Sequence, residues 1–462
     1  MKNNLKELSF KRGDKIKVKC VDFTFDGQGL AKYLNRVIFV PSLLIDEEAE
    51  VEILYRKKDY DIGKITKLIA FSPYRINPLC KCATSCGGCS FQNLDYQKEL
   101  EIKKNLAINT LKTIGKVNFK SLNPKIIGMD EPTYYRNKIQ IPFGYDKQHR
   151  LVYGLYKYKS HGIVPIKECV ISSKEHISIL SSIKDLMLDM KIKVYDEDLE
   201  KGVLRHVLIR VGKASKEIMV VLIVNEVNFK NKKNFVNELV KLHPEITTVI
   251  YNYNLRKTNV ILGEKEEVAY GKGYIYDYLL GVKFKISSKS FYQVNHDQCE
   301  KLYSLAIQKA MLTKEDDVLD LYCGIGTIGL IAAKYAKKVQ GIEIVKEAII
   351  DAKENAKLNN IENISFMVGD AKDVLLKKAY DVIFLDPPRK GLDLSLIKQI
   401  MNSHPKRIVY VSCDVGTLAR DLTYLTKNYN IDLIDFVDMF PRTFHVETVA
   451  SLSEANTKKI FR

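Results

Sequence analysis

Cys413 follows Ser412 at the end of a short hydrophobic run, Ile408–Val411, which predicts a buried strand. A thiolate is a strong nucleophile and a good leaving group, so a cysteine at the end of a strand is a candidate for covalent catalysis. The alternative is a small buried cysteine that only packs. The residues that the rest of the chain brings to that point decide between these two interpretations.

A second candidate site is the glycine-rich stretch Asp320–Gly329, which follows a predicted strand and opens a predicted helix. Its three glycines, of which Gly324 is the first, have the spacing of a dinucleotide-binding loop, and the acidic Glu343 follows about twenty residues later. The carboxylate of Asp320, however, is a poor neighbour for a pyrophosphate and a good one for an ammonium group.

The other carboxylates near this loop suit a ligand with hydroxyl and amino groups. Glu343 can accept hydrogen bonds from both hydroxyls of a ribose, and Asp370 from the amino group of an adenine. S-adenosylmethionine has an amino-acid tail, a ribose and an adenine but no phosphates, so we favour it over NAD and over a turn without ligand. Asp386 begins a stiff turn with two prolines, and its ionised carboxylate can only accept hydrogen bonds, from a substrate base or from the cofactor.

Four of the nine cysteines lie within residues 80–89, a spacing that indicates metal binding in a reducing compartment. All four local thiolates can hold zinc. Alternatively, Cys80, Cys86 and Cys89 can hold a [4Fe–4S] cluster together with the distant Cys169, which leaves Cys82 as a bystander. The spacing alone slightly favours zinc.

The elements that position these residues form four predicted regions of an α/β protein. Residues 1–70 alternate short β-like runs with turns, which predicts a small closed barrel of the OB type. Residues 71–94 are irregular and hold the cysteine cluster. Residues 95–285 predict a mixed, mostly antiparallel domain with a few helices. Residues 286–462 alternate strands and helices, which predicts a parallel, doubly wound sheet with ligand sites at the carboxyl ends of its strands.

The strands of the last region are expected at hydrophobic runs that precede the candidate residues. They are Asp317–Tyr322, Lys338–Ile342, Ile364–Val368, Val382–Asp386 and Ile408–Val411, with a final pair near Ile431–Val437 and Val446–Leu452. In the barrel region, Ala31–Val40 forms one of the β-like runs.

The net charge of +17 suggests an extended polyanion as partner. The basic excess lies mainly in residues 71–285, beside two nearly neutral regions. No apolar run approaches the length that crosses a bilayer, and the first residues lack the apolar core of a secretory peptide. We therefore expect a cytoplasmic protein that binds no membrane.

Five motifs, in this order along the chain, resemble those of the RNA 5-methyluridine (uracil-5) methyltransferases. They are Ser290–Asn295, Asp320–Gly324, Asp386–Gly391, Val411–Asp414 and Phe444–Glu447. The resemblance covers nearly the whole chain and is strongest to the 23S ribosomal RNA enzymes that carry a TRAM domain and an iron–sulfur cluster. It implies that the N-terminal barrel is a TRAM RNA-binding domain, and that the last region is a Rossmann-like class I methyltransferase domain.

The resemblance also implies roles for single residues. Gln293, Tyr322, Glu343 and Asp386 would bind S-adenosylmethionine, to which the residue types at the glycine-rich loop add Gly324 and Asp370. Cys80, Cys86, Cys89 and Cys169 would hold the [4Fe–4S] cluster. Cys413 would be the nucleophile and Glu447 the base. Tyr322 stands where phenylalanine is common, which puts only fine contacts to the cofactor in doubt.

The chemistry of uracil explains why such an enzyme needs a cysteine. Carbon 5 of uracil is a poor nucleophile until a thiolate adds to carbon 6 and forms an enolate. The carbon 5 proton must later be removed so that the thiolate can leave, which is the work of a carboxylate. The target uridine must leave its stack to be reached.

These inferences predict a monomeric enzyme that acts on a single-stranded or looped part of ribosomal RNA. Two alternatives are the same reaction on transfer RNA, and an RNA-binding factor with a vestigial methyltransferase fold. The barrel and the cysteine cluster favour ribosomal RNA, because bacterial relatives that act on transfer RNA typically lack both.

Overall fold

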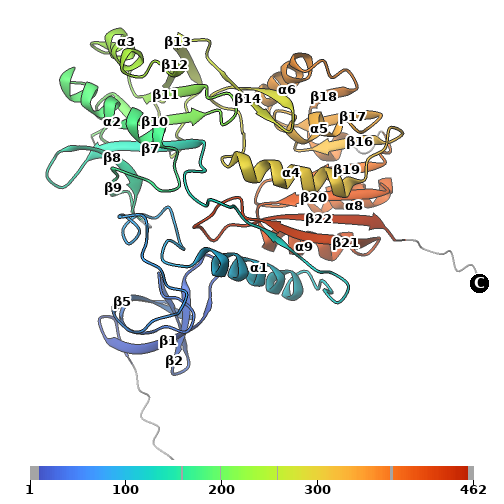
Figure 1. Ribbon diagram of the computed structural model, residues 1–462, viewed down its shortest axis with the longest axis horizontal. Coiled ribbons are helices and arrows are strands. Elements are labelled where there is room, and N and C mark those ends of the chain that lie inside the picture. The colour runs from blue at the N-terminus through green and yellow to red at the C-terminus, as the bar shows by residue number, and fades with distance from the viewer. Residues whose placement is uncertain (1–9, 158–159, 198, 258, 375–377, 456–462) are drawn as a thin grey trace, which may run out of the picture. The chain divides into compact units, whose positions relative to one another are not determined.

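A computed structural model describes residues 10–157, 160–197, 199–257, 259–374 and 378–455 (Figure 1). Residues 1–9, where the sequence predicts no secretory core, lie outside the described residues. The chain divides into two compact units. One comprises Met1–Leu106 with Arg442–Phe444, and the other comprises Ala107–Pro441 with His445–Arg462. The predicted division into four domains stays a prediction.

The first unit contains a closed five-stranded barrel with the strand order β1-β2-β3-β5-β4. Its strands are β1 (Lys15–Phe23), β2 (Gly29–Tyr33), β3 (Arg36–Val40), β4 (Glu48–Arg56) and β5 (Tyr60–Ala70). In β1 the buried Ile16, Val18 and Cys20 alternate with exposed lysines, as expected where one face of a strand fills a barrel. The predicted small barrel is confirmed.

The run Ala31–Val40, predicted as one β-like run, is two strands. Leu34 has a φ of 52° and, with Asn35, turns the chain between β2 and β3, which pair antiparallel. Leucine seldom adopts a positive φ, so its presence in the turn concealed the hairpin.

The rest of the first unit holds the cysteine loop, the beginning of helix α1 (Tyr96–Thr113) and a short piece from near the C-terminus. The amides of Ser90 and Phe91 donate to the carbonyl of Arg442, at 2.9 and 3.0 Å. The guanidinium of Arg442 donates to the carbonyl of Leu94 at 2.8 Å, and its amide to Glu99 at 2.8 Å. The side chain of Arg442 is buried. Three C-terminal residues are therefore part of the N-terminal unit.

The second unit begins with a seven-stranded sheet in the order β13-β12-β11-β10-β7-β8-β9. Its elements are β7 (Lys138–Tyr145), β8 (Leu151–Tyr156), β9 (Ile163–Pro165), α2 (Lys174–Asp189), β10 (Leu204–Val211), β11 (Ile218–Val224), α3 (Lys232–Leu242), β12 (Ile246–Tyr253) and β13 (Lys265–Gly271). All pairs are antiparallel except β11 with β12, which confirms the mixed, mostly antiparallel prediction. Helices α2 and α3 lie beside this sheet (Figure 1).

A two-stranded sheet and one helix lead from this sheet to the next. They are β14 (Ile275–Leu279), β15 (Val282–Ile286) and α4 (His296–Ala310). The side chain of Asn295 caps α4 by accepting from the amide of Gln298, which fixes where the helix begins.

The last sheet has eight strands in the order β18-β17-β16-β19-β20-β22-β21-β6. Its elements are β6 (Ile126–Ile127), β16 (Asp317–Leu321), α5 (Thr327–Ala332), β17 (Lys338–Glu343), α6 (Lys346–Leu358), β18 (Ile364–Val368), α7 (Ala371–Val374), β19 (Val382–Leu385), α8 (Leu394–Ser403), β20 (Arg407–Ser412), α9 (Val415–Leu425), β21 (Tyr429–Val437) and β22 (Glu447–Glu454). Strands β16 to β20 run parallel, and β22 is antiparallel to β20. The predicted Rossmann-like fold is confirmed.

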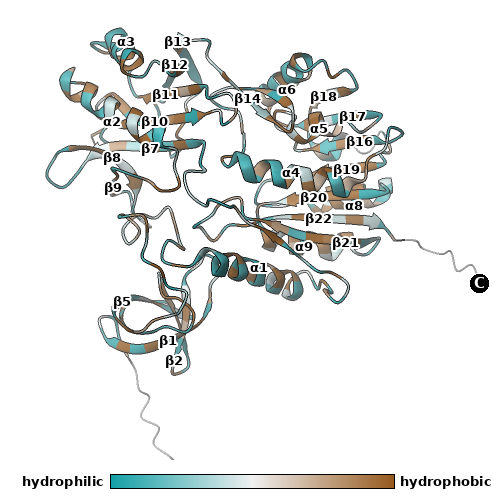
Figure 2. Cartoon of the chain, viewed as in Figure 1, coloured by the Kyte–Doolittle hydropathy of each residue, from teal (hydrophilic) through white to brown (hydrophobic). Residues whose placement is uncertain are grey.

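The hydrophobic core of the second unit lies on both faces of this parallel sheet. The side chains of β19 are buried without exception, since helices cover both faces of such a sheet. In Figure 2, β11 is brown with hydrophobic residues, whereas the visible side of α4 is mainly hydrophilic. Among the described residues, no helix is both long and apolar enough to span a membrane.

Candidate active site

Six neighbouring strands bring the predicted site residues to one edge of the eight-stranded sheet. In spatial order this edge carries Asp370 after β18, Glu343 at the end of β17, Tyr322 and Gly324 after β16, Asp386 after β19, Cys413 after β20 and Glu447 at the start of β22. The strand order reverses at β16, which has β17 on one side and β19 on the other. Ligands bind at such switch points, outside the carboxyl ends of parallel strands.

Cys413 and Glu447 meet because β20 and β22 are antiparallel neighbours. Ser412 pairs with Thr448, so Cys413 and Glu447 are the next two residues at the open end of this pair. Asp414 caps helix α9 with its side chain, which accepts from the amide of Thr417 at 2.9 Å. The cap ends β20 at this point and leaves the thiol beside the carboxylate.

Two carboxyl groups beside the thiol are hard to ionise. Burial raises the pKa of Glu447 to about 8, the nearby Asp386 raises it further, and Arg389 opposes the rise. Asp386 keeps part of its side chain exposed, but the surrounding protein still desolvates its carboxyl group and raises the pKa to about 7. Glu447 therefore has a pKa close to neutral pH, where a general base works best.

The thiol of Cys413 is neutral at physiological pH in the free protein. Burial raises its pKa to about 11, and the charges of Glu447 and Asp386 add to the rise, while Arg389 opposes it. A thiol attacks carbon only after it has lost its proton, and a positive charge bound near Cys413 would favour that loss.

The backbone of the glycine-rich loop after β16 adopts the left-handed conformation, with positive φ, at several positions. Tyr322 has a φ of 64°, Gly324 of 54° and Gly326 of 84°. A Cβ atom at Gly324 would have open space around it, so a ligand can approach the backbone there. The carboxylate of Glu343 accepts from the amide of Gly324 at 3.3 Å and from that of Val345 at 3.0 Å, which orients it at this loop.

Asp320 lies beneath the same loop and is completely buried. Its Oδ2 accepts from the amide of Gly329 at 2.8 Å, while its Oδ1 has no partner among the described residues. Burial raises the pKa of Asp320 to about 8, which the hydrogen bond from Gly329 opposes. A buried acceptor without a partner is costly, and a ligand ammonium group would satisfy it.

The turn that begins at Asp386 is held by helix α9. The amide of Leu392 donates to Asp421 at 2.9 Å, and the guanidinium of Arg420 donates to the carbonyls of Lys390 and Leu392, each at 3.0 Å. Gly391 has a φ of 71°, and a Cβ atom there would come within 2.7 Å of Arg420 and Asp421. Only glycine fits this close approach.

Gln293 lies in the irregular segment 287–295 between β15 and α4. It is buried, and its backbone carbonyl accepts from the side chain of Asn137 at 3.0 Å. The segment also carries Ser290 and Asn295, both buried. The central sheet and the methyltransferase sheet both contact this segment, which links the two sheets.

The acidic residues at this edge suit a cation rather than a phosphate. Asp320 and Asp386 have no cationic side chain paired with them among the described residues, and burial makes ionisation of both unfavourable. S-adenosylmethionine carries an ammonium and a sulfonium charge and has hydroxyl and amino donors, so it matches this set of acceptors. The pyrophosphate of NAD would be repelled by the same carboxylates.

The cysteine loop does not form a metal site in the described structure. No three His, Cys, Asp or Glu side chains converge as metal ligands within the described ranges. The amide of Gly88 donates to the sulfur of Cys86, and the side chain of Gln92 to that of Cys89, both at 3.4 Å. Cys169 belongs to the other unit. The iron–sulfur cluster, its zinc alternative and the ligand set with Cys80 stay predictions.

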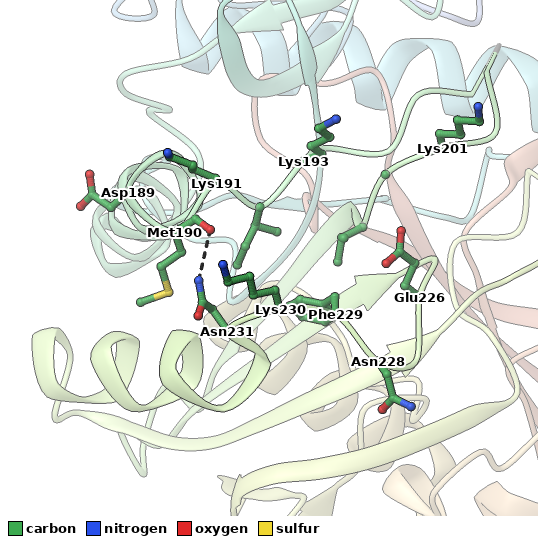
Figure 3. A pocket seen from close by; sticks show the side chains of 13 residues that line it. Asp189, Met190, Lys191, Lys193, Lys201, Glu226, Asn228, Phe229, Lys230 and Asn231 are labelled. Atoms are coloured by element: carbon green, nitrogen blue, oxygen red, sulfur yellow. Dashed lines mark hydrogen bonds between the residues drawn. The ribbon is translucent and has the colours of Figure 1, made fainter.

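A hollow of about 770 Å³ opens in the central sheet region, between the end of α2 and the start of α3 (Figure 3). Lys191, Lys193, Lys201 and Lys230 line it, and none of these forms an ion pair with a described carboxylate. The side chain of Asn231 donates to the carbonyl of Met190 at 3.3 Å, which joins its two walls.

Comparison with known proteins identifies the family. Residues 95–455 match the family model described as tRNA (Uracil-5-)-methyltransferase. The chain belongs to the tRNA (uracil-5-)-methyltransferase family. It is an S-adenosylmethionine-dependent RNA methyltransferase, as the sequence predicted.

The relatives match over nearly their whole lengths. An uncharacterized RNA methyltransferase of Halalkalibacterium halodurans is 42% identical over 451 residues, which cover 96% of this chain and 98% of the relative. One of Staphylococcus aureus is 41% identical over 435 residues, which cover 93% and 96%. The crystal structure of the Pyrococcus abyssi tRNA (uracil-54, C5)-methyltransferase in complex with S-adenosyl-L-homocysteine aligns with a TM-score of 0.77 and 28% identity, over 95% of this chain and 100% of that one.

Sequence reasoning missed the polar residues that support the site. Asn137, Arg210 and Asp421 are buried and bond to the segments that carry Gln293 and Asp386. A possible signal was the arginine within the otherwise hydrophobic run Val207–Val211. Arginine is almost never buried without a partner, so it marks a specific contact.

Proposed function

We propose that this enzyme methylates carbon 5 of a uridine in RNA through a covalent adduct between Cys413 and carbon 6 of the base. The observation that carries the proposal is the meeting of Cys413, Glu447 and Asp386 on three neighbouring strands. A nucleophile next to a carboxylate with a pKa near neutrality is the pair that this reaction requires.

In the proposed reaction the sulfur of Cys413 bonds to carbon 6, and the electron pair of the carbon 5–carbon 6 double bond moves to the carbonyl oxygen at carbon 4. Bound S-adenosylmethionine supplies an electrophilic methyl group. The enolate electron pair would bond carbon 5 to this methyl group, while the bond between the methyl carbon and the sulfonium sulfur breaks and S-adenosylhomocysteine leaves. Carbon 5 then carries both the methyl group and its original proton. Glu447 removes that proton, the double bond re-forms, and the thiolate leaves.

The charges of the site support this sequence. The thiol is neutral in the free protein because burial and two carboxylates oppose its ionisation. A sulfonium charge near Asp386 offsets those carboxylates and lowers the pKa of Cys413. Attack by the thiolate is thereby linked to the presence of the methyl donor.

For the cofactor, we propose contacts from Gln293, Tyr322, Gly324, Glu343, Asp370 and Asp386. We add Asp320, whose Oδ1 would accept from the ammonium group. Glu343 would accept from the ribose hydroxyls, and Asp370 from the adenine amino group.

Ribosomal RNA is the substrate that we favour. The closed barrel and the cysteine cluster support it, because they are combined in the 23S ribosomal RNA members of the resemblance. Transfer RNA is the second candidate, and one observation favours it. The Pyrococcus abyssi enzyme, named for a tRNA uracil, aligns with 95% of this chain.

The lysine-lined hollow would contact the RNA outside the catalytic edge. Lys191, Lys193, Lys201 and Lys230 outnumber the two acidic residues of the lining, Asp189 and Glu226 (Figure 3). Lysines of this kind bind phosphates by charge, without reading the base. The uridine itself would have to leave its stack and enter the edge that holds Cys413. We retain a monomeric cytoplasmic enzyme as the expected form.

We also propose a [4Fe–4S] cluster on the cysteine loop. Its support is the resemblance together with the two N–H donors that point at sulfurs of Cys86 and Cys89, since such bonds stabilise thiolates. Freshly purified protein that is brown and bleaches with dithionite would support it. A colourless protein with stoichiometric zinc would refute it.

The covalent step is tested with RNA that contains 5-fluorouridine. Fluorine cannot be removed as a proton, so the adduct between Cys413 and the methylated base accumulates and survives denaturing electrophoresis. We expect an S-adenosylmethionine-dependent band shift with the intact enzyme and none with Cys413→Ala. A shift of equal yield in Cys413→Ala would refute the role of this cysteine.

The substrate is tested by mapping 5-methyluridine in ribosomal and transfer RNA from cells that lack the gene, beside cells that carry Cys413→Ala. Loss at one or two ribosomal positions in both strains would support ribosomal RNA. Loss confined to transfer RNA would establish the second candidate. Survival of every 5-methyluridine in both strains would contradict the catalytic proposal.

A further inference from the structure

The segment that carries Gln293 buries most of its polar side chains although it has no regular secondary structure. Ser288, Ser290, Gln293 and Asn295 are each less than 10% exposed, and the backbone of residues 287–294 belongs to neither helix nor strand. Buried backbone groups need hydrogen-bond partners, and a segment without a ladder must obtain them from elsewhere. The residues that supply these partners determine where Gln293 lies.

Asn137 supplies two of these hydrogen bonds from the edge of the central sheet. Its Nδ2 donates to the carbonyl of Gln293 at 3.0 Å, and its amide donates to the carbonyl of Val294 at 2.8 Å. Its own carbonyl accepts from the amide of Val211 at 2.8 Å, at the end of β10. Asn137 therefore joins the backbone of Gln293 to two strands of the central sheet.

Arg210 supplies a third hydrogen bond from β10. Its Nη2 donates to the carbonyl of Ser290 at 2.9 Å, while its Nε and Nη1 have no partner among the described residues. Arg210 pairs in register with Lys138 on β7, another basic residue. An apolar side chain would pack at this position without the cost of burying a guanidinium group. The bond to the carbonyl of Ser290 is the contact that an arginine makes here and an apolar side chain cannot make.

The methyltransferase sheet holds the same segment from the other end. Asp351 on α6 accepts from the hydroxyls of Ser287, at 2.9 Å, and Ser290, at 2.7 Å. Asn295 donates to the carbonyl of Met439 at 3.0 Å. Ser290 is thus held from both sides, by Arg210 through its carbonyl and by Asp351 through its hydroxyl. Gln293 lies between these anchored points.

We propose that Asn137 and Arg210 are positioning residues that set the affinity for S-adenosylmethionine by fixing the backbone of Ser290–Gln293. The inference rests on the proposed function, in which Gln293 contacts the cofactor. It adds that the central sheet, which supplies no group to the cofactor, nevertheless determines how well the cofactor binds.

The test measures the dissociation constant of S-adenosylmethionine by calorimetry for the full-length protein and its variants. We expect Asn137→Ala and Arg210→Met to weaken binding by about tenfold, the effect of losing one or two buried hydrogen bonds. Arg210→Lys should restore part of the affinity, because an ammonium group can still donate to the carbonyl of Ser290. Affinity for RNA should change much less than affinity for the cofactor.

Asn254→Ala is the matched control. Asn254 is as buried as Asn137, lies at the end of β12 in the same sheet, and donates to the carbonyls of Val260 and Ile261 at 2.7 and 3.0 Å. It should lower the midpoint of thermal unfolding as Asn137→Ala does, without weakening cofactor binding. Equal weakening by the control and by Asn137→Ala would overturn the inference, because the effect would then be general destabilisation.

Gln293→Ala separates this inference from the proposed function. If Gln293→Ala weakens cofactor binding and both Asn137→Ala and Arg210→Met leave it unchanged, the positioning role is wrong and the proposed contact stands. If Gln293→Ala leaves binding unchanged, the contact and the positioning role both fail, while the 5-fluorouridine test of Cys413 is unaffected. Should Asn137→Ala not fold, Asn137→Ser takes its place with the same expected loss.

Discussion

Asp320→Asn should make the protein more stable at pH 8 and less able to bind its cofactor. The carboxyl group of Asp320 is completely buried, and burial raises its pKa to about 8, well above the 3.8 usual for an aspartic acid. The amide of asparagine can still accept from the amide of Gly329 but carries no charge. The substitution therefore removes the titration and keeps the hydrogen bond.

The sign follows from proton binding. A carboxyl group with a raised pKa binds its proton more tightly in the folded than in the unfolded state, so its contribution to stability is complete below about pH 4 and is lost as the pH rises towards 8. The loss is at most about 1.4 kcal/mol per pH unit, and across this interval at most about 6 kcal/mol. Asp320→Asn and the wild type should be equally stable near pH 4, and the variant should gain an advantage of several kcal/mol by pH 8.

The assay is thermal unfolding at pH 5, 6, 7 and 8, combined with calorimetry of S-adenosylmethionine binding. Binding to the variant should weaken by about tenfold or more, because an ammonium group loses a charged acceptor. Asp381→Asn is the control. Burial tends to raise the pKa of Asp381, but the ion pair with Lys406 at 2.8 Å, the amide of Asp317 and the charge of Lys337 together lower it, so its pH dependence has the opposite sign. A stability difference between Asp320→Asn and the wild type that stays constant from pH 5 to 8 would refute the reasoning.

Three further outcomes are expected from the same site and the basic hollow. The rate at which iodoacetamide alkylates Cys413 can be measured by mass spectrometry. At pH 8 this rate should be about 100-fold lower than for a thiol of pKa 9, and it should rise tenfold per pH unit up to about pH 11. A plateau of the rate near pH 9 would contradict the raised pKa. Glu447→Gln should reduce turnover by at least about 100-fold and accumulate a methylated covalent adduct between the enzyme and ordinary uridine RNA. If free RNA were the only species found, Glu447 would not be the base. Lys191→Glu with Lys193→Glu should weaken RNA binding and flatten its dependence on salt, with cofactor affinity unchanged. Lys427→Glu, in the exposed turn after α9, should do neither, and equal effects of both variants would assign the loss to net charge alone.

The strands of the methyltransferase sheet could be predicted because each is a hydrophobic run that ends at a functional residue. Ile364–Val368 was predicted with the observed bounds, and β16, β19 and β20 differ from their predictions by one or two residues. Parallel strands buried on both faces leave this signal in the sequence, and their common edge follows from the topology. The meeting of Cys413 and Glu447 additionally required the antiparallel pairing of β20 with β22.

The supporting residues could not be predicted because their partners are distant in sequence and are backbone atoms. Asn137 bonds to a carbonyl 156 positions away, and Arg210 to one 80 positions away. In β10 the polar residues Arg205, His206 and Arg210 suggest contact with water, but every residue from Leu204 to Arg210 is buried. A carbonyl carries no sequence signature, so only the folded chain reveals what these side chains bind.

The tripeptide Arg442–Phe444 has a consequence for how such a chain can change during evolution. It is the only part of the sequence after Leu106 that the first unit includes, and the polypeptide passes between the two units after residues 106, 441 and 444. A gene that lost the region coding for residues 10–106 would still encode this tripeptide, whose arginine would then lack the carbonyl of Leu94 and the amides of Ser90 and Phe91. The tripeptide lies in the loop between β21 and β22, so the deletion would leave that loop without these partners. The first unit is therefore interleaved with the second along the chain, and its gain or loss requires compensating changes in the loop between β21 and β22.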